Sequence, residues 1–403
     1  RSSSMGMDGK IFGVSKRTQL IDFDKKWIHP KLIRVVMECI DFLGKGNIPC
    51  MYISQALKAE LLPVKDVLVD HKVRAYLNCG LVMQIVQKMI FMQMIWYFEN
   101  DRENPVMAGF SPHDVSVQFL YKELHKFEDG NWMDADKKGN DLTLPFYLGH
   151  GVFHMANQEF YRFKPGSYKW NILRGGCYLL TNFTAVRGTK CVRQGAGCCS
   201  GHWMTTWYNG WCGYVMDKYI WDAIYPEYLY KKNVVDRHGG DDAVKVVRKG
   251  FEYYNNLTLA HFAAEFFGMV YTPAIKDSVM KPYAKEEDVQ FLKRKFTVVD
   301  NTIAYAIDPD SIYACLSYTT KGVEDVLKQN VAAAQMEAVY HGKEFFDNLS
   351  EQLRKVRGHS GYHVPLKTWD QSVDRWKSHY LGVTRNINDG CYTSEDIVSY
   401  ADL

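Results

Sequence analysis

The chain has 403 residues, of which 47% are hydrophobic and 24% charged, as in an ordinary globular protein. These proportions exclude a disordered, collagen-like or coiled-coil fibrous chain, and the length suggests about two to three domains. Lysine and arginine number 49 and aspartate and glutamate 46, so the net charge is +3. This balance excludes binding of nucleic acid through overall charge, and any basic surface must be local.

The N-terminal segment and the cysteines indicate the redox state of the compartment in which the protein is expected. The first ten residues lack the apolar core of a secretion signal, and the ten cysteines form no C-x-x-C pair. We therefore expect free thiols in a reducing compartment. The first residue is arginine rather than methionine, so we expect the sequence to be an engineered chain, a fragment or a piece cut from a longer polypeptide.

The first half of the chain predicts a mixture of elements. Residues 16–100 are predicted to be mostly helical, interrupted by a charged segment at 58–74. The apolar window Leu81–Phe98 contains three glutamines and a lysine, which favours a buried amphipathic helix, and no transmembrane segment is expected. Residues 128–145 predict a short strand, a turn and the start of a helix. Residues 165–200, rich in glycine and β-branched residues, predict strands and loops.

The second half has stronger patterns. Residues 201–226 predict a long buried helix, and Val234–Val247 predicts a hairpin whose Gly-Gly supplies the positive φ of a tight turn. Another helix is expected over 256–270, and the last hundred residues place apolar side chains at helical spacing. Helices followed by mixed elements and then by helices predict an α+β fold with a helical cap.

Gly240-Asp241-Asp242 stands at the tip of the predicted hairpin. Two adjacent carboxylates cannot both be buried without a cation. Their oxygen atoms favour Mg²⁺ or Mn²⁺. Taken alone, such a tripeptide is more often a solvated turn.

A second acidic block runs from Asp136 to Asp141. A strand is expected to end near Met133 and a helix to open near Leu142, so Asp136 is expected at a strand end, facing the hairpin. Three carboxylates can hold two Mg²⁺ about 3.5–4 Å apart, the arrangement used for in-line phosphoryl transfer. Asp134 is an alternative metal ligand, and a plain polar turn is the alternative for the whole stretch.

The third block is Ser200-Gly201-x3-Thr205-x3-Asn209 at the start of the predicted buried helix. Thr205 and Asn209 are four residues apart and share one helix face. An asparagine amide and an aspartate carboxylate together can hydrogen-bond a ribose 2′-OH, the group that separates RNA from DNA. The block therefore points to recognition of a ribose.

The three blocks resemble motifs A, B and C of viral RNA-dependent RNA polymerases, namely D-x4-D, S-G-x3-T-x3-N and G-D-D. Four further blocks resemble motifs D, E, F and G of picornavirus-like members of that family. They are Thr272–Lys276, Phe291–Arg294, Leu57–Arg74 and Ser3–Gly6. All seven stand in the family's order. The resemblance implies a right-hand fold, with fingers at 1–128 (their N-terminal part missing) and 148–195, palm at 129–147 and 196–296, and thumb at 297–403.

The resemblance also implies the reaction and its residues. An RNA 3′-OH would attack the α-phosphate of an NTP with two Mg²⁺, for which Mn²⁺ is a substitute. Asp136, Asp241 and Asp242 would be catalytic metal ligands, and Lys276 would protonate the leaving pyrophosphate. Nucleotide-binding roles are implied for Lys65, Lys72, Arg74, Asp141, Ser200, Thr205 and Asn209. Template or primer roles are implied for Ser3, Ser4, Gly6, Gly201, Leu292, Lys293 and Arg294.

Partners and location follow from the same resemblance. It implies RNA template and primer as ligands, release from a polyprotein, a genome-linked protein primer and other viral replication proteins. It further implies replication of a positive-strand genome in the host cytoplasm at membrane-associated sites.

Departures from the family pattern leave two alternatives. Gly239 stands where the family has tyrosine, Asp236 and Arg237 charge a strand that is normally apolar, and Gly197–Gly201 lacks the usual proline. These changes motivate a catalytically inactive RNA-binding or replication-complex module as an alternative, against which the retained Asp136, Asp241, Asp242 and Lys276 speak. A reverse transcriptase would share the palm carboxylates, but it excludes the 2′-OH with an aromatic gate.

Overall fold

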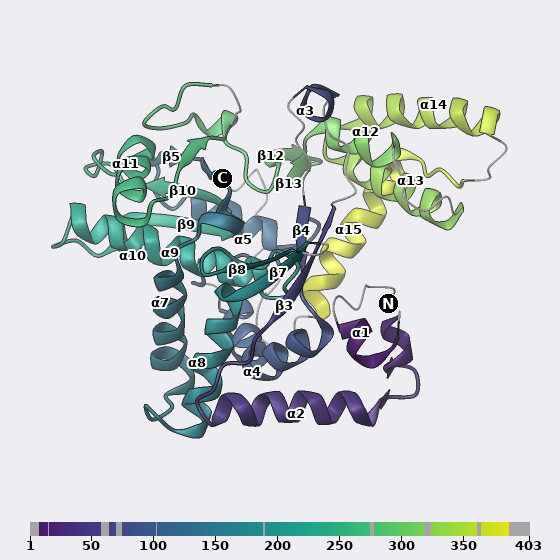
Figure 1. Ribbon diagram of the computed structural model, residues 1–403. Coiled ribbons are helices and arrows are strands. Elements are labelled where there is room, and N and C mark those ends of the chain that lie inside the picture. The colour runs from purple at the N-terminus through teal and green to yellow at the C-terminus, as the bar shows by residue number, and fades with distance from the viewer. Residues whose placement is uncertain are drawn as a thin grey trace.

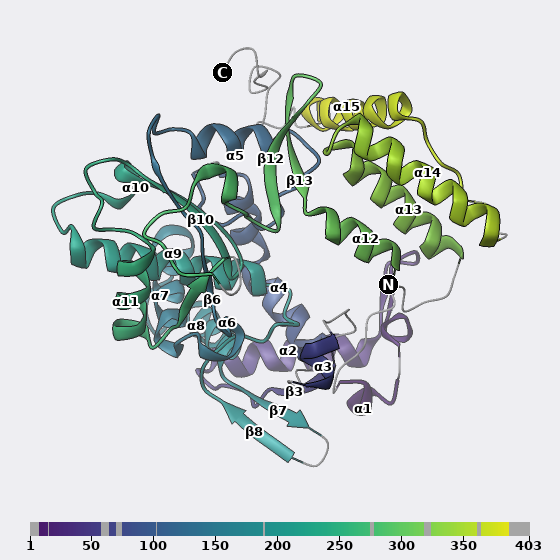
Figure 2. The ribbon, with the colours of Figure 1, turned by 90° about the horizontal axis from the view of Figure 1, so that it is seen from above.

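The protein is described by a computed structural model that covers residues 8–14, 16–57, 64–69, 75–101, 103–187, 190–274, 278–317, 324–360 and 364–386. It is a mixture of helices and small sheets, which confirms the predicted α+β class. Helices α7 to α11 gather on one side of the molecule, and the C-terminal helices α12 to α15 gather on the other (Figures 1 and 2).

A four-stranded sheet and three helices form the N-terminal part. The sheet has the order β4-β3-β7-β8, built from β3 (Tyr52–Leu57), β4 (Ala75–Asn78), β7 (Phe183–Arg187) and β8 (Lys190–Gln194). Only the β3–β7 pair is parallel. Helices α2 (Pro30–Gly44), α4 (Leu81–Glu99) and α8 (Tyr168–Thr181) pack against one another beside it. Smaller elements here are α1 (Asp8–Phe12), a 3-10 turn (Arg17–Gln19), β1 (Ile21–Asp22), β2 (Trp27–Ile28) and α3 (Val64–Leu68).

Residues 16–100 are mostly helical, as predicted, through α2 and α4, but they also contain four strands. The strands and loops predicted over 165–200 are found at β7 and β8, whereas residues 168–181 form α8, so the prediction is wrong there. Gly175 and Gly176 argued against a helix. A Cβ at Gly175 would lie 2.6 Å from Leu43 of α2, and one at Gly176 would lie 2.9 Å from Ile90 of α4. The glycines therefore serve close helix packing rather than a turn.

Helix α4 is one helix among the described residues that is long and apolar enough to cross a membrane. Of its apolar stretch, 56% is buried inside the protein. Its exposed side also carries apolar residues, including Met89, Met92 and Trp96, so the predicted amphipathic pattern is wrong. The helix packs against α2 and α8, as a core helix does.

The central sheet carries the predicted hairpin. Its order is β5 (Asn131–Met133), β10 (Asp242–Val247) and β9 (Val234–Gly239), all antiparallel. Beside it, β6 (Ala135–Lys137) pairs with β11 (Tyr271–Pro273). Val234 and Val247 belong to the same apolar cluster as residues of α9 (Thr205–Ile224), whereas Val235 and Val244 pack with α5 (Ser116–Leu124). Side chains along the hairpin thus alternate between a face toward α9 and a face toward α5.

The predicted hairpin and the predicted long buried helix are confirmed by β9–β10 and α9. Helix α5 packs on this sheet, although it lies in the range predicted as fingers. The segment before α5 also contacts the sheet, because the His238 N–H donates to the Pro105 carbonyl at 2.8 Å. Other elements around the sheet are α6 (Asn140–Thr143), α7 (Phe146–Ala156), a π turn (Asn157–Tyr161), α10 (Tyr230–Asn233), α11 (Asn256–Phe267) and a 3-10 turn (Glu286–Asp288).

The C-terminal part is helical, as predicted. It begins with the hairpin β12 (Arg294–Val299) and β13 (Thr302–Ile307) and continues through α12 (Pro309–Ser317), α13 (Glu324–Val339), α14 (Lys343–Ser360) and α15 (Trp369–Asn386). Its own apolar cluster includes Trp376 and Phe346. The predicted palm–thumb boundary at 296/297 falls inside β12.

Candidate active site

The tip of the β9–β10 hairpin presents the two adjacent carboxylates. Gly239 pairs with Asp242, and Gly240 and Asp241 form the turn, with Gly240 at φ +91°. This left-handed conformation favours glycine. Asp241 is exposed and Asp242 is half-buried.

Asp136 reaches the same place from β6. Lys245 of β10 pairs with Met133 of β5, and carrying this antiparallel register forward by three residues sets Asp242 opposite Asp136. Asp136 pairs with Thr272 of β11 within the strand, so the predicted place at a strand end is wrong. It nevertheless lies beside the hairpin.

Like charges converge at this point. Burial and then the carboxylates of Asp136 and Asp241 raise the pKa of Asp242 to about 6, although a hydrogen bond from the Leu292 backbone opposes them. The pKa of Asp134 is likewise raised to about 6, by burial and then by Asp242 and Asp288. Carboxylates that resist ionising together are a donor set suited to a divalent cation. Asp134 therefore stays an alternative ligand.

Motif E packs directly on the hairpin tip. Leu292 and Lys293 form a two-residue turn at φ +57° and +59°, and the Leu292 N–H donates to Asp242 Oδ2 at 2.5 Å. A Cβ at Gly239 would lie 2.4 Å from the Leu292 side chain. Leu292 thus fills the space beside the predicted metal ligands where the family's tyrosine would stand.

The primer-side residues differ in what they contact. Lys293 is exposed at the turn. Arg294 is 8% exposed, and its guanidinium donates to Glu337 of α13 at 2.9 and 2.6 Å and to the Tyr305 carbonyl at 2.8 Å. The guanidinium therefore joins the palm edge to the thumb, and this ion pair occupies the group predicted to grip RNA.

The motif B loop is anchored to strand β4. The Leu77 N–H donates to Ser200 Oγ at 3.2 Å, and the Gly201 N–H donates to the Leu77 carbonyl at 2.8 Å. A Cβ at Gly201 would lie 2.2 Å from that carbonyl oxygen. Thr205 Oγ1 donates to the Cys199 and His202 carbonyls at 2.9 and 2.7 Å. Ser200, Gly201 and Thr205 therefore shape the loop.

Of the remaining predicted site residues, some lie in described elements and others lie outside the described residues. Asn209 is buried in α9, one turn beyond Thr205. Asp141 lies in α6, but its side chain falls outside the described part of the structure. Lys65 is exposed in α3. Six predicted residues lie outside the described residues, namely Ser3, Ser4, Gly6, Lys72, Arg74 and Lys276.

A buried charged cluster was not assigned any role by the sequence. Lys137, Asp217, Asp236, His238 and Lys245 lie between the sheet and α9, each at most 5% exposed. Asp217, Asp236 and His238 place ligand atoms within 4.8 Å of one another, which could hold a metal ion. However, Lys245 Nζ lies 3.1 Å from Asp217 Oδ2, so an ammonium already supplies positive charge there. The unusual charge in β9 was the one signal in the sequence.

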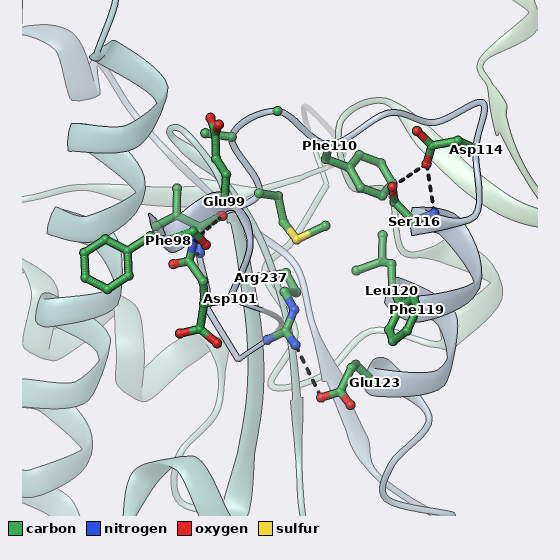
Figure 3. Close-up of a pocket in the computed structure, with 15 residues that line it drawn as sticks. Phe98, Glu99, Asp101, Phe110, Asp114, Ser116, Phe119, Leu120, Glu123 and Arg237 are labelled. Atoms are coloured by element: carbon green, nitrogen blue, oxygen red, sulfur yellow. Dashed lines mark hydrogen bonds and ion pairs between the residues drawn. The ribbon is translucent and has the colours of Figure 1, made fainter. Parts of the chain in front are cut away.

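Arg237 points to the opposite face of β9, into the pocket of Figure 3. Its guanidinium donates to Glu123 Oε2 at 3.3 Å and to the Asp236 carbonyl at 2.7 Å. Three further carboxylates, those of Glu99, Asp101 and Asp114, line the same pocket. Asp236 and Arg237, the two charged residues in a strand that is apolar in the family, therefore both have partners.

Comparisons with known proteins agree with the motif pattern. A family model described as viral RNA-dependent RNA polymerase matches residues 13–357. The chain is 24% identical over 348 residues to the RNA1 polyprotein of Satsuma dwarf virus, covering 81% of the chain and 16% of that protein. It is 29% identical over 312 residues to the genome polyprotein of Rice tungro spherical virus, covering 73% and 9%. The chain thus spans less than a fifth of either polyprotein.

A solved structure shows the fold. The Sicinivirus 3Dpol RNA dependent RNA polymerase superposes with a TM-score of 0.75 at 17% identity, covering 94% of this chain and 77% of that one. This similarity confirms the predicted right-hand arrangement of fingers, palm and thumb.

Proposed function

We propose, since the chain belongs to the viral RNA-dependent RNA polymerase family, that it extends RNA from NTPs on an RNA template during replication of a positive-strand genome. One observation carries the proposal. Asp136, Asp241 and Asp242 converge from β6 and the β9–β10 hairpin, and burial followed by the two neighbouring carboxylates raises the pKa of Asp242. This is the donor set that two-metal nucleotidyl transfer requires.

Asp136, Asp241 and Asp242 would hold two divalent ions, Mg²⁺ or its substitute Mn²⁺. Bound there, the ions would supply Lewis-acid activation of the RNA 3′-OH and neutralise charge on the pyrophosphate. The Leu292 N–H orients Asp242 by holding Oδ2 at 2.5 Å. The direction of the second carboxylate oxygen of Asp242 is then fixed as well, because both oxygens lie in one plane.

Nucleotide selection is assigned to motif B and its neighbours. Asn209 with Asp141 would recognise the ribose 2′-OH, supported by Ser200 and Thr205. The anchoring of the loop on Leu77 supports this assignment because a fixed loop keeps α9 in register with the incoming sugar. Lys65, Lys72 and Arg74 would bind the triphosphate, and Lys276 would protonate the leaving pyrophosphate.

The RNA strands are assigned to residues around this centre. Lys293 and the Leu292 backbone would contact the primer end, while Arg294 would act through its ion pair with Glu337. Ser3, Ser4, Gly6 and Gly201 would guide the template.

Partners and location are proposed from the relatives. Their names describe polyproteins, which supports release of this chain from a longer precursor, and we propose a genome-linked protein primer and other viral replication proteins as partners. Membrane-associated sites in the host cytoplasm are the proposed location. We propose no transmembrane segment, since α4 is packed against α2 and α8.

Primer extension on an RNA template with Mg²⁺ and NTPs tests the function. The parent is expected to extend the primer, Asp241→Ala to lose extension, and Asp374→Ala, which alters an exposed thumb residue, to behave as the parent. Retained extension in Asp241→Ala would contradict the metal assignment. No extension by the folded parent would favour the inactive RNA-binding module.

Comparing NTPs with dNTPs tests the ribose assignment. The parent is expected to prefer NTPs, and Asn209→Ala to lose about fivefold of that preference, since a hydrogen bond to the sugar is worth about 1 kcal/mol. A parent that prefers dNTPs would instead be a reverse transcriptase.

A further inference from the structure

A lysine adjacent to a proposed metal ligand is buried in the palm core. On β6, Asp136 is exposed and Lys137 is 3% exposed, because successive side chains of a strand point to opposite faces. Lys137 Nζ has no hydrogen-bond partner among the described residues. A buried ammonium without such a bond is costly unless nearby carboxylates compensate its charge.

Helix α9 provides the place for this ammonium. A Cβ at Gly213 would lie 2.6 Å from Lys137 Nζ and 2.9 Å from His238 Nδ1. The strand β6, the helix α9 and the strand β9 therefore meet over a residue that has no side chain. Any larger residue at 213 would push the lysine or the histidine away.

The surrounding charges balance the lysine. His238 Nε2 lies 3.0 Å from Asp236 Oδ2 and 3.5 Å from Asp217 Oδ2, and Lys245 Nζ lies 3.1 Å from Asp217 Oδ2. Burial lowers the pKa of Lys137, and the carboxylate of Asp217 opposes this by raising it. If His238 is neutral and both lysines are charged, the two carboxylates balance the two ammonium groups. Without Lys137, the cluster would hold one uncompensated negative charge in the core.

Each member comes from a segment that carries the proposed chemistry. Lys137 follows Asp136, Asp217 lies on the same helix as Thr205 and Asn209, and His238 and Lys245 flank the Asp241-Asp242 tip on its two strands. Buried ion pairs of this kind are weak stabilisers, but they favour one specific arrangement of the segments they join. In this protein the segments joined in this way also carry Asp136, Asp241 and Asp242.

We propose that Lys137 is a positioning residue, whose buried ammonium, together with Asp217, Asp236, His238 and Lys245, ties β6 to α9 and the hairpin and so holds Asp136 against Asp242. The catalytic consequence of this inference rests on the proposed function. Its consequence for metal binding does not, because metal binding depends on the spacing of the carboxylates alone. The role differs from ligation, since Lys137 points away from the metal site.

Two variants of adjacent lysines test the proposal. Lys137→Met keeps the length of the stem and removes the charge, whereas Lys138→Met alters the exposed neighbour in the turn that follows β6. We expect Lys137→Met to lower kcat at least tenfold and to raise the Mg²⁺ concentration for half-maximal extension severalfold, with KM for NTP changed less than twofold. Lys138→Met is expected to match the parent in all three.

Mn²⁺ binding, followed by electron paramagnetic resonance, provides a readout besides activity. Asp241→Ala defines the background, and Lys137→Met is expected to weaken Mn²⁺ binding severalfold while Lys138→Met does not. If the parent lacks extension but Lys137→Met still weakens Mn²⁺ binding, the proposed function falls and the positioning role stands. If Lys137→Met keeps the parent's metal dependence and binding, the positioning role is refuted.

A double variant tests the charge balance even if Lys137→Met alone fails to fold. Lys137→Met with Asp217→Asn removes one charge of each sign and leaves Lys245 beside its cross-strand partner Asp236. We expect it to fold better than Lys137→Met alone and to recover part of the Mn²⁺ affinity. A double variant that is worse than either single variant would refute the charge balance.

Discussion

Acid sensitivity of His202 offers a quantitative test of the motif B loop. The side chain is 5% exposed, its Nδ1 accepts the Met204 N–H at 3.0 Å, and its Nε2 has no hydrogen-bond partner among the described residues. Burial lowers the pKa of His202 to about 3, from an ordinary value of about 6.5. The folded protein therefore holds the neutral imidazole.

The sign and size of the effect follow from this difference. Protonation favours the unfolded chain, so the contribution of His202 is fully present above pH 6.5 and is lost as the pH falls from 6.5 toward 3. Between pH 7.5 and 5.5 the free energy of unfolding is expected to fall by about 1.4 kcal/mol through this residue alone.

His202→Asn isolates the contribution. The asparagine Oδ1 can accept the Met204 N–H as an Asx turn does, but it cannot take up a proton in this range. Urea unfolding followed by tryptophan fluorescence at pH 5.5, 6.5 and 7.5 measures both proteins. A cavity left by the smaller side chain lowers stability equally at each pH, so the slope is the test. Equal slopes for the two proteins would refute the buried neutral histidine.

Three further substitutions probe contacts around the site. Glu337→Gln leaves the buried Arg294 guanidinium without its ionic partner and is expected to lower the free energy of unfolding by about 3 kcal/mol in thermal or urea unfolding. Gly239→Tyr restores the family residue but collides with Leu292, and is expected to lower stability by about 1–3 kcal/mol and to reduce primer extension. Gly201→Ala forces a Cβ against a backbone carbonyl and is expected to abolish extension.

Matched controls separate these effects from general damage. Glu351→Gln alters an exposed glutamate that pairs with Arg354, and is expected to change stability by less than about 1 kcal/mol. Gly195→Ala adds a methyl group where no heavy atom lies within 4 Å, and should leave extension intact. Adding Leu292→Ala to Gly239→Tyr should recover stability. If a variant and its control changed stability or primer extension equally, the contact assigned to the substituted residue would be contradicted.

The sequence predicted the elements whose signals are local. The Gly-Gly turn between β-branched residues indicated the β9–β10 hairpin, and the apolar run after Ser200 indicated α9. Such signals depend on turn chemistry and on residue periodicity within about twenty positions. The chain order of the carboxylates and of the S-G-x3-T-x3-N block also indicated the family, because that order is a property of the sequence alone.

The sequence misled where a residue served a distant partner. Gly175 and Gly176 indicated a loop, but they allow α8 to approach α2 and α4 closely. Arg294 stands in a basic block typical of phosphate contact, but it pairs with Glu337, 43 residues away. Neither partner can be identified from spacing along the chain.

By itself, the sequence determined the family, because the order of the carboxylates and of the S-G-x3-T-x3-N block is carried by short motifs. Only the tertiary structure decided what surrounds them. It set Leu292 against Gly239, tied Ser200 to Leu77, and brought Lys137 to Asp217, eighty residues along the chain. Burial of charge is determined by contacts between segments, and these contacts arise only when the segments fold together.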